Sequence, residues 1–222
     1  MLMSEHSQSN LFLSGEGDAW FLRNSESLNT GSNSPDIDYI CSTLNAFQNT
    51  VSSILEIGCG GGAKLSALSK HFDSEGHGID PSEKAIQWAN KNYSQSSGKL
   101  NFQTGLATEL PYEDDQFDLV FFGFCLYLVP PSEILRAAAE ADRVLRKGGF
   151  LAILDFDFGQ QKVNPYKHAD GIHSYKNNYS NLFTSLGYFH QVSKWSFNHK
   201  DNSFAVDKDE RISIEVLFKE LL

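Results

Sequence analysis

The sequence predicts an α/β protein with a mostly parallel, doubly wound sheet of about seven strands. From residue 51 to about residue 157, short apolar runs typical of strands alternate with segments whose apolar residues recur at helical spacing. Near the C-terminus, two further runs, 188–197 and 211–221, are joined by a polar loop with no room for a crossover helix. Because parallel strands need such a crossover, these two runs should form an antiparallel hairpin.

The helical segments carry start and stop signals. Ser34 and Pro35 supply an N-cap residue and a first-turn proline to the segment that follows them. Gly148 and Gly149 end the segment 132–147, since glycine readily adopts the left-handed conformation that terminates helices. Helices therefore separate the strands, as a doubly wound sheet requires.

Composition narrows the class of protein further. The 222 residues carry a formal net charge of -10, which disfavours nucleic acid as a partner because such proteins gain affinity from clustered Lys and Arg. The longest apolar run, 119–129, is too short to cross a bilayer, and the N-terminus lacks the basic and apolar regions of a signal peptide. We expect a cytoplasmic protein without a membrane partner.

The three cysteines, Cys41, Cys59 and Cys125, are odd in number and lack CxxC spacing. This pattern argues against a disulfide framework and against a zinc site, and it fits a reducing compartment. His168 and His173 stand on either side of Asp170 at a spacing that matches no common metal-ligand pattern. No metal is therefore expected.

A glycine-rich turn, ILEIGCGGGAKL over residues 54–65, follows the first strand. Gly58 and Gly60 allow backbone positions that side chains would block, so a ligand can lie against main-chain N–H groups at a helix N-terminus. Asp80 ends the next strand, at the spacing where a carboxylate meets a ribose diol. A turn with only a packing role and a dinucleotide fingerprint of the GxGxxA type are the alternatives.

Glu56 favours a ligand that carries a positive charge. It stands shortly before Gly58, at the end of an apolar strand. Beside a dinucleotide pyrophosphate its carboxylate would be repulsive, whereas beside a sulfonium or ammonium group it would be attractive.

Four stretches, LEIGCGGG, GIDPS, GLATELPYEDDQFDLVFFGFCLYLV and RVLRKGGFLAILDF, occur in this order between residues 51 and about 157. They resemble the successive motifs of the class I S-adenosylmethionine-dependent methyltransferases. The resemblance implies a Rossmann-like sheet, S-adenosyl-L-methionine as the cofactor, and a cofactor-binding core over residues 51–157. We then expect a single methyltransferase domain, 1–222, with an N-terminal cap segment (1–33), a substrate-side insertion (158–180) and the C-terminal antiparallel hairpin (188–218).

The resemblance also implies a cofactor site residue by residue. Asp80 would accept hydrogen bonds from the ribose hydroxyls, and Leu106 and Ala107 would border the adenine. The family often has aspartate where Leu106 stands, so a backbone carbonyl or Glu109 would have to hold the adenine amino group. The full set of expected cofactor contacts is Glu56, Gly58, Cys59, Gly60, Asp80, Pro81, Leu106, Ala107, Gly123 and Phe124.

Four residues are candidates for contact with the acceptor or for proton removal: Tyr127 after the fourth strand, Asp155 at the end of the fifth, and His168 and His173 in the insertion. Asp157 is a further candidate base. Histidine titrates near neutrality and could take a proton from a hydroxyl or ammonium group. Turn capping by the aspartates, exposure of the histidines and burial of Tyr127 are the competing interpretations.

Together these features predict transfer of a methyl group to an O or N atom of a small polar metabolite by in-line displacement, in a monomer or homodimer. Two other functions stay open. One is a protein that binds S-adenosylmethionine or S-adenosylhomocysteine without transfer, since Leu106 departs from the family pattern and no base stands out. The other is an NAD-dependent oxidoreductase, which shares the glycines and Asp80 but not the later motifs.

Overall fold

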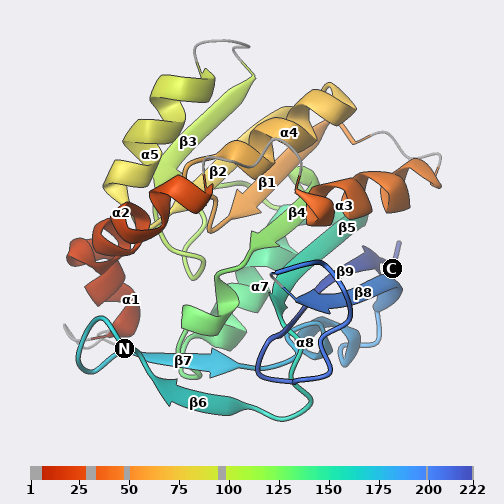
Figure 1. Cartoon of the computed structure of the whole chain (residues 1–222). Helices are drawn as coiled ribbons and strands as arrows, with labels where there is room; N and C mark the ends of the chain where they lie inside the picture. The colour runs from red at the N-terminus through yellow and green to blue at the C-terminus, as the bar shows by residue number, and fades with distance from the viewer. Residues whose placement is uncertain (1–6, 29–33, 48–50, 95–98, 199, 222) are drawn as a thin grey trace.

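The computed structural model describes residues 7–28, 34–47, 51–94, 99–198 and 200–221. Seven strands form one sheet in the order β3-β2-β1-β4-β5-β9-β8 (Figure 1). Strands β1 to β5 run parallel, β9 pairs antiparallel with β5, and β8 pairs antiparallel with β9, which confirms the predicted fold class. The strands are β1 Ser53–Ile57, β2 Glu75–Asp80, β3 Leu100–Thr104, β4 Phe117–Gly123, β5 Leu145–Phe156, β8 Phe189–Asn198 and β9 Arg211–Lys219.

Helices cover both faces of the sheet, because alternate residues of the central strands point to opposite sides. Ile54 and Phe121 belong to a core that includes apolar residues of α3, α4 and α5. Leu55 and Phe122 belong to a second core, with apolar residues of α7 and α8. These helices are α3 Pro35–Asn45, α4 Ala63–Phe72, α5 Glu83–Ala89, α7 Ile134–Val144 and α8 Asn181–Thr184.

An N-terminal helical segment packs against the turn that follows β2 (Figure 1). It consists of α1 Gln8–Leu11, the π-helix η1 Phe12–Glu16, and α2 Gly17–Leu28. Asp18 accepts hydrogen bonds from the Ser82 hydroxyl, at 2.8 Å, and from the Lys84 amide, at 3.0 Å. The carboxylate thus adds a second cap to the N-terminus of α5, whose own N-cap is Ser82.

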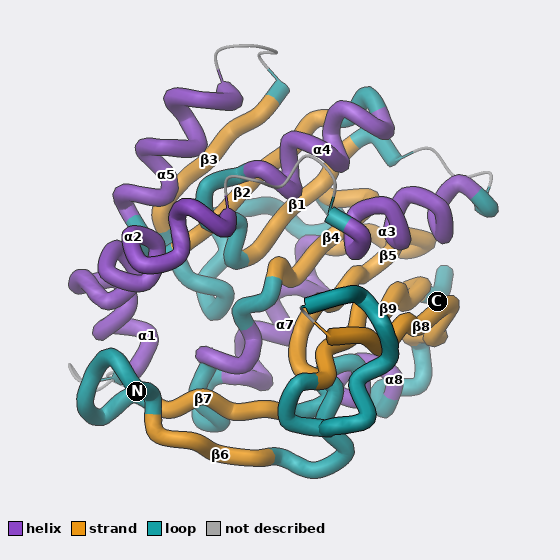
Figure 2. The backbone as a smooth tube through the Cα atoms, in the orientation of Figure 1, coloured by secondary structure: helices purple, strands orange, loops and turns teal. Residues whose placement is uncertain are grey.

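A two-stranded antiparallel sheet lies between the main sheet and α8 in the sequence, within the predicted insertion. Its strands are β6 Lys162–Pro165 and β7 His173–Lys176, and Figure 2 shows the pair below α1. Gln8 joins α1 to this sheet: its Nε2 donates to the His173 carbonyl at 2.9 Å, and its Oε1 accepts from the His173 amide at 3.0 Å. The same Nε2 donates to the Leu128 carbonyl at 2.6 Å, at the end of the 3-10 turn η3 Leu126–Leu128.

The helix predicted over residues 132–147 ends earlier than the two glycines indicate. Helix α7 stops at Val144, and Leu145 already has extended backbone, with φ -79° and ψ 123°. Leu145 pairs with Phe117 at the start of β4, so sheet pairing begins before the glycines are reached. Gly148, at φ 73°, instead accommodates a left-handed position inside the long strand β5.

None of the helices in the described part of the chain is long and apolar enough to cross a membrane. Within the same residues, no cluster of His, Cys, Asp and Glu side chains could hold a metal ion.

Candidate functional site

A cavity opens at the carboxyl ends of β1, β2 and β4, which is where open α/β sheets bind ligands. Its floor is the glycine turn between β1 and α4, and its sides are the ends of β2 and β4 and the loop after β3. The N-terminal helical segment closes the remaining side. All ten predicted cofactor contacts line the cavity: Glu56, Gly58, Cys59, Gly60, Asp80, Pro81, Leu106, Ala107, Gly123 and Phe124.

The glycine turn needs glycine for both conformation and space. Gly58, Gly60 and Gly62 all have positive φ, at 76°, 49° and 82°. A Cβ on Gly58 would also lie 2.5 Å from the Cβ of Cys125, so the two segments could not approach as they do. The Gly58 and Cys59 amides donate to the Ile79 carbonyl, at 2.8 and 3.1 Å, which fixes the turn against β2.

Asp80 faces the glycine turn from the end of β2. One carboxylate oxygen accepts from the Gly60 amide and the other from the Ser82 amide, both at 2.9 Å. Burial raises the pKa of Asp80 to about 6, although these two N–H donors favour the ionised form. Each oxygen keeps a lone pair for a ligand hydroxyl, as ribose recognition requires.

Glu56 is almost fully buried, at 1% exposure, at the other end of the floor. Its Oε2 has no hydrogen-bond partner among the residues that the structure describes. Gly123 makes room for the carboxylate, because a Cβ there would lie 2.5 Å from Oε1. Burial raises the pKa of Glu56 to about 8, in spite of the nearby Lys64 ammonium. A cationic ligand would satisfy this oxygen and stabilise its charge.

Lys64 places a positive charge beside Glu56. Its Nζ lies 2.5 Å from Oδ2 of the buried Asp36, whose other oxygen accepts from the Ser34 hydroxyl. Lys64 and Ser34 both line the cavity. A carboxyl group with one unpartnered oxygen and an ammonium group therefore stand at the same end of the cavity, and together they complement the ammonium and carboxylate of an amino acid.

Part of the chain that forms this cavity matches a known protein family. Residues 54–149 match the family model described as a methyltransferase domain. A demethylmenaquinone methyltransferase of Staphylococcus aureus is 40% identical over 103 residues, which are 46% of this chain and 42% of that protein. Residues 54–149 therefore form a methyltransferase domain.

Solved structures share the fold of this methyltransferase domain. The 1,6-didemethyltoxoflavin-N1-methyltransferase of Burkholderia thailandensis, solved with 1,6-didemethyltoxoflavin and S-adenosylhomocysteine bound, has a TM-score of 0.74 at 16% identity. The match covers 99% of this chain and 92% of that one. An S-adenosylmethionine-dependent methyltransferase of Methanosarcina mazei has a TM-score of 0.62 at 19% identity, over 81% of this chain and 97% of that one.

The residues of the cavity fit S-adenosylmethionine, the cofactor that the sequence resemblance implies. Asp80 and the glycine turn suit a ribose, and the apolar loop after β3 suits an adenine. Glu56 and Lys64 suit the amino-acid end, and the unpaired Oε2 of Glu56 suits its positive charge. The chain spans less than half the length of the curated relatives it matches, 42% in the case above.

The loop after β3 lacks the acidic side chain common in the methyltransferase family. Leu106, Ala107 and Thr108 line the cavity, and Thr108 is buried. Glu109 is exposed and does not line the cavity, although it pairs with Leu106 in a short antiparallel bridge. Of the two acceptors expected to hold an adenine amino group, Glu109 therefore lies outside the cavity and the backbone carbonyls of this loop remain.

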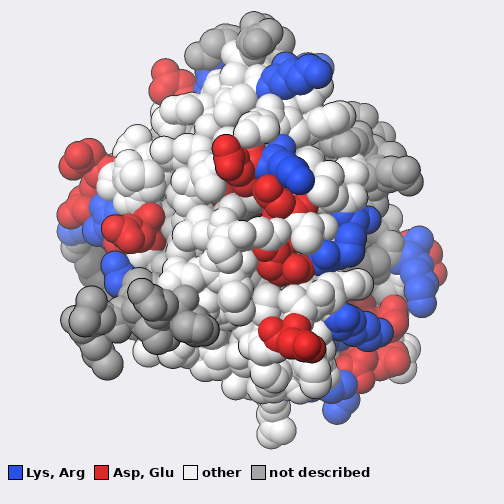
Figure 3. All heavy atoms as spheres, turned by 90° about the vertical axis from the view of Figure 1, so that its left-hand side faces the viewer, with Lys and Arg blue, Asp and Glu red and all other residues white. Residues whose placement is uncertain are grey.

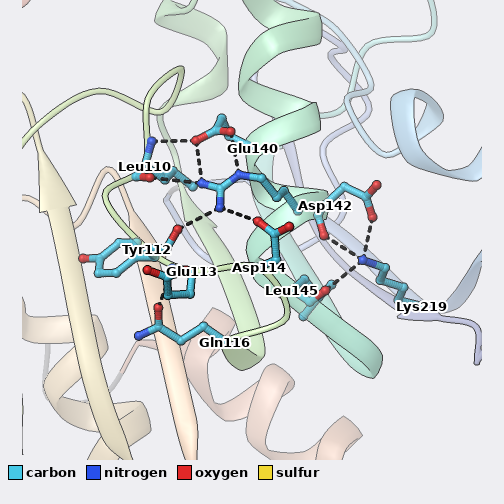
Figure 4. Close-up of polar contacts among 10 residues, drawn as sticks. Leu110, Tyr112, Glu113, Asp114, Gln116, Glu140, Asp142, Leu145 and Lys219 are labelled. Carbon is cyan, nitrogen blue, oxygen red and sulfur yellow. Dashed lines mark hydrogen bonds and ion pairs between the residues drawn. The ribbon is translucent and has the colours of Figure 1, made fainter.

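Arg143 on α7 holds the continuation of this loop in place. Figure 4 shows its partners Leu110, Tyr112, Asp114 and Glu140. Its guanidinium donates to the Leu110 carbonyl at 3.0 Å, to the Tyr112 carbonyl at 2.7 Å and to Asp114 at 2.9 Å. It also pairs with Glu140, whose carboxylate accepts from the Leu110 amide at 2.7 Å. The planar fork of arginine allows these contacts at once, which a lysine ammonium cannot reproduce.

Replacing Arg143 by lysine is expected to lower the free energy of unfolding by about 1–2 kcal/mol, through the loss of charged hydrogen bonds to the loop. S-adenosylhomocysteine, the demethylated product, should then bind about three- to tenfold more weakly, because the adenine side of the cavity is less well ordered. Urea unfolding and calorimetric titration measure the two effects. Arg136→Lys, at an exposed position of the same helix, should change neither, and equal effects of the two variants would contradict this role.

The four predicted catalytic residues lie in different surroundings. Tyr127 is half-buried beside Phe124, with ring centroids 5.1 Å apart, and burial raises its pKa. Asp155 is buried and accepts from the amides of Tyr127, at 3.2 Å, and Phe156, at 2.8 Å. Burial raises the pKa of Asp155 to about 7. These contacts fix the turn after β4, which is the capping interpretation of Asp155.

None of these four residues lines the cavity, and neither does Asp157. His168 is exposed in the turn between β6 and β7, and His173 is half-buried in β7, where its backbone bonds to Gln8. Asp157 pairs with Lys194 at 2.8 Å and accepts from the Ser196 hydroxyl at 2.7 Å. Catalytic roles for these residues therefore stay predictions.

Several residues that line the cavity are marked by no sequence motif, so the sequence did not predict them. Lys64 stands one turn into α4, and Thr108 follows the predicted adenine contacts. Ser9, Phe12 and Trp20 come from the N-terminal segment. The apolar cluster around Trp20 was a usable sign that this segment covers a surface, but its docking site is not encoded in local sequence.

Proposed function

We propose that this chain transfers a methyl group from S-adenosylmethionine to an O or N atom of a small molecule. When bound, the cofactor supplies an electrophilic methyl group, which the acceptor's lone pair attacks in line with the breaking carbon–sulfur bond. The protein's contribution is to hold and align the two partners and to exclude water.

The buried carboxylate of Glu56 is the observation that carries this proposal. Its unpaired oxygen suits the ammonium group of the cofactor's amino-acid end, and its negative charge would also attract a sulfonium. A dinucleotide would bring a pyrophosphate to the same glycine turn, where the carboxylate would repel it. Glu56 therefore favours a methyl donor over NAD.

We infer that different residues around the cavity hold different parts of the cofactor and the acceptor. We infer that Asp80 holds the ribose, that the loop at Leu106 and Ala107 covers the adenine, and that Glu56 and Lys64 hold the amino-acid end. Tyr127 is the candidate for contact with the acceptor, and Asp155 is a positioning residue that orients Tyr127 through the backbone of η3. His168 and His173 are left as candidate bases only if the acceptor reaches the β6–β7 sheet.

The surface and the cysteines support a small-molecule acceptor in a reducing compartment. On the face that carries the N-terminal helices, basic side chains lie beside acidic ones rather than in a continuous basic stripe (Figure 3). Such a face gives little affinity for a phosphate backbone. All three cysteines are free, as in cytoplasmic proteins.

Transfer of a labelled methyl group tests the proposal. The chain is incubated with S-adenosylmethionine labelled in the methyl group and with a cell extract limited to molecules below about 1 kDa; we expect protein-dependent label in an organic product and release of S-adenosylhomocysteine. Asp80→Ala is the inactive control. Binding of S-adenosylhomocysteine without any movement of label would favour the alternative function, a cofactor-binding protein without transfer.

A further inference from the structure

The side of the cavity that faces the N-terminal segment is lined with apolar and aromatic residues. Phe12 and Trp20 come from that segment, and Phe124, Leu128 and Val129 come from the end of β4 and η3. Gln8 holds the two parts together through the Leu128 carbonyl. This acceptor wall, defined as these five lining residues, adjoins Gly123. The family resemblance implies that Gly123, Phe124 and Tyr127, after the fourth strand, lie near the transferred methyl group.

Polar groups behind the acceptor wall are already engaged. Arg23 pairs with Glu16 at 2.5 Å and donates to the Tyr166 hydroxyl at 3.0 Å. Trp20 lies within hydrogen-bonding reach of the Tyr127 hydroxyl, and this contact opposes the rise that burial causes in the pKa of Tyr127. The Asp155 carboxylate accepts from backbone amides.

Among the residues that the structure describes, the acceptor wall therefore presents ring surfaces, and no unpaired charge, to a bound acceptor. A sugar or an aliphatic carboxylate would lose its water there without new hydrogen bonds, which is unfavourable. A flat ring would lose only apolar hydration and would gain stacking with the aromatic side chains.

Phe124 adds a second, independent observation. Its φ of 66° lies in the left-handed region, which a bulky side chain adopts only at a cost. Its amide donates to the Leu154 carbonyl at 3.0 Å, and its ring packs on Tyr127 and Phe156, with centroids 5.1 and 5.2 Å away. Glycine would relax the backbone at this position, yet the chain places an aromatic ring there, half-exposed in the cavity.

We propose that the rings of Phe124 and Trp20 bind the methyl acceptor, and that the acceptor is a flat aromatic or heteroaromatic molecule with an acidic hydroxyl or ring N–H. This inference rests on the proposed function and narrows the polar metabolite expected from the sequence. The acceptor loses its proton to solvent, since no free base lines the described wall. Its oxygen or nitrogen then forms a bond to the methyl carbon, the carbon–sulfur bond breaks, and that electron pair stays on sulfur as a neutral thioether.

Probe binding to the protein saturated with S-adenosylhomocysteine tests the inference. One probe set holds one- to three-ring phenols and N-heterocycles such as catechol, 1-naphthol and 4-hydroxyquinoline; the other holds hexoses, aliphatic amines and hydroxy acids. Saturation-transfer NMR should detect the flat set and not the polar set. Phe124→Leu and Trp20→Leu should each weaken the best flat probe at least tenfold, and more than they weaken S-adenosylhomocysteine.

Phe204→Leu is the matched control, because this ring is 60% exposed and lies outside the cavity; it should leave probe affinity unchanged. Binding of the polar set alone, no binding of any flat probe, or flat-probe binding that survives both cavity variants overturns the inference. Label transfer separates it from the proposed function. Methylation of a hexose or hydroxy acid would refute the aromatic acceptor but leave the proposed methyl transfer standing. Binding of flat probes with no turnover of any acceptor would support the aromatic acceptor site but refute the proposed methyl transfer.

Discussion

Replacing Asp80 by alanine is expected to weaken S-adenosylhomocysteine binding by about 100-fold, or about 2.7 kcal/mol. A ribose offers two hydroxyls to this carboxylate, and a hydrogen bond to a charged group contributes about 1.5–3 kcal/mol. The substitution also removes the acceptors of the Gly60 and Ser82 amides, which hold the turn in shape. Calorimetric titration gives the affinity, and thermal unfolding of the free variant shows whether it is folded.

Asp18→Asn is the control for Asp80→Ala. Asp18 is a nearby carboxylate that caps the same turn from α2, yet it does not line the cavity. We expect its removal to change the affinity less than threefold. If both variants weaken binding equally, Asp80 acts only through the shape and charge of the turn, and the ribose assignment is wrong.

Glu56→Gln is expected to stabilise the free protein and to weaken cofactor binding. In the folded chain the pKa of Glu56 rises from 4.5 to about 8, so the folded state holds a proton that the unfolded state releases. The folded state then loses stability as pH rises from about 4.5 to about 8, by up to about 1.4 kcal/mol per pH unit. Glutamine does not titrate, so the advantage of the variant should grow from pH 5 to pH 8.

The same variant should bind the cofactor more weakly, although its free form is more stable. Glutamine keeps an acceptor atom but not the charge that attracts an ammonium group, and we expect about 10- to 100-fold weaker binding of S-adenosylhomocysteine at pH 7.5. Glu113→Gln makes the same chemical change at an exposed side chain and should alter neither property. A variant less stable than the original chain at every pH would show that Glu56 is ionised and paired in the free protein.

If Glu56→Gln makes the free protein more stable and weakens cofactor binding, the native site gives up stability in order to bind its ligand. Burial without a partner for Oε2 makes ionisation of Glu56 unfavourable until a cation binds, and the structure tolerates this group at the cavity floor. The same principle applies to Phe124, whose left-handed backbone is unfavourable for a phenylalanine. Both residues line the cavity next to Gly123.

Local sequence predicted the cavity floor because its chemistry depends on backbone conformation. Glycine at positions 58 and 62 allows the positive φ that the turn requires, and Asp80 follows at a spacing set by the crossover helix between two parallel strands. The end of the helix before β5 was misplaced, because the pairing of Leu145 with Phe117 overrides the glycine stop signal that comes later.

The acceptor side could not be predicted in the same way. The contact of Gln8 with His173 joins residues 165 positions apart, and neither residue belongs to a motif. Trp20 and Phe124 become neighbours in one wall only when the N-terminal helices dock on the turn after β2. Tertiary packing of this kind has no short-range signal in the sequence. The sequence therefore offered His168 and His173 as candidate catalytic residues on the same footing as Tyr127.

Titration of the chain with S-adenosylhomocysteine and, separately, with NAD tests the central claim most directly. The buried Glu56 carboxylate and the glycine turn predict binding of S-adenosylhomocysteine in the micromolar range, with a proton released on binding near pH 7 and a heat that depends on the buffer. NAD should give no heat. Absence of S-adenosylhomocysteine binding, or tighter binding of NAD, would contradict the assignment of this cavity to a methyl donor.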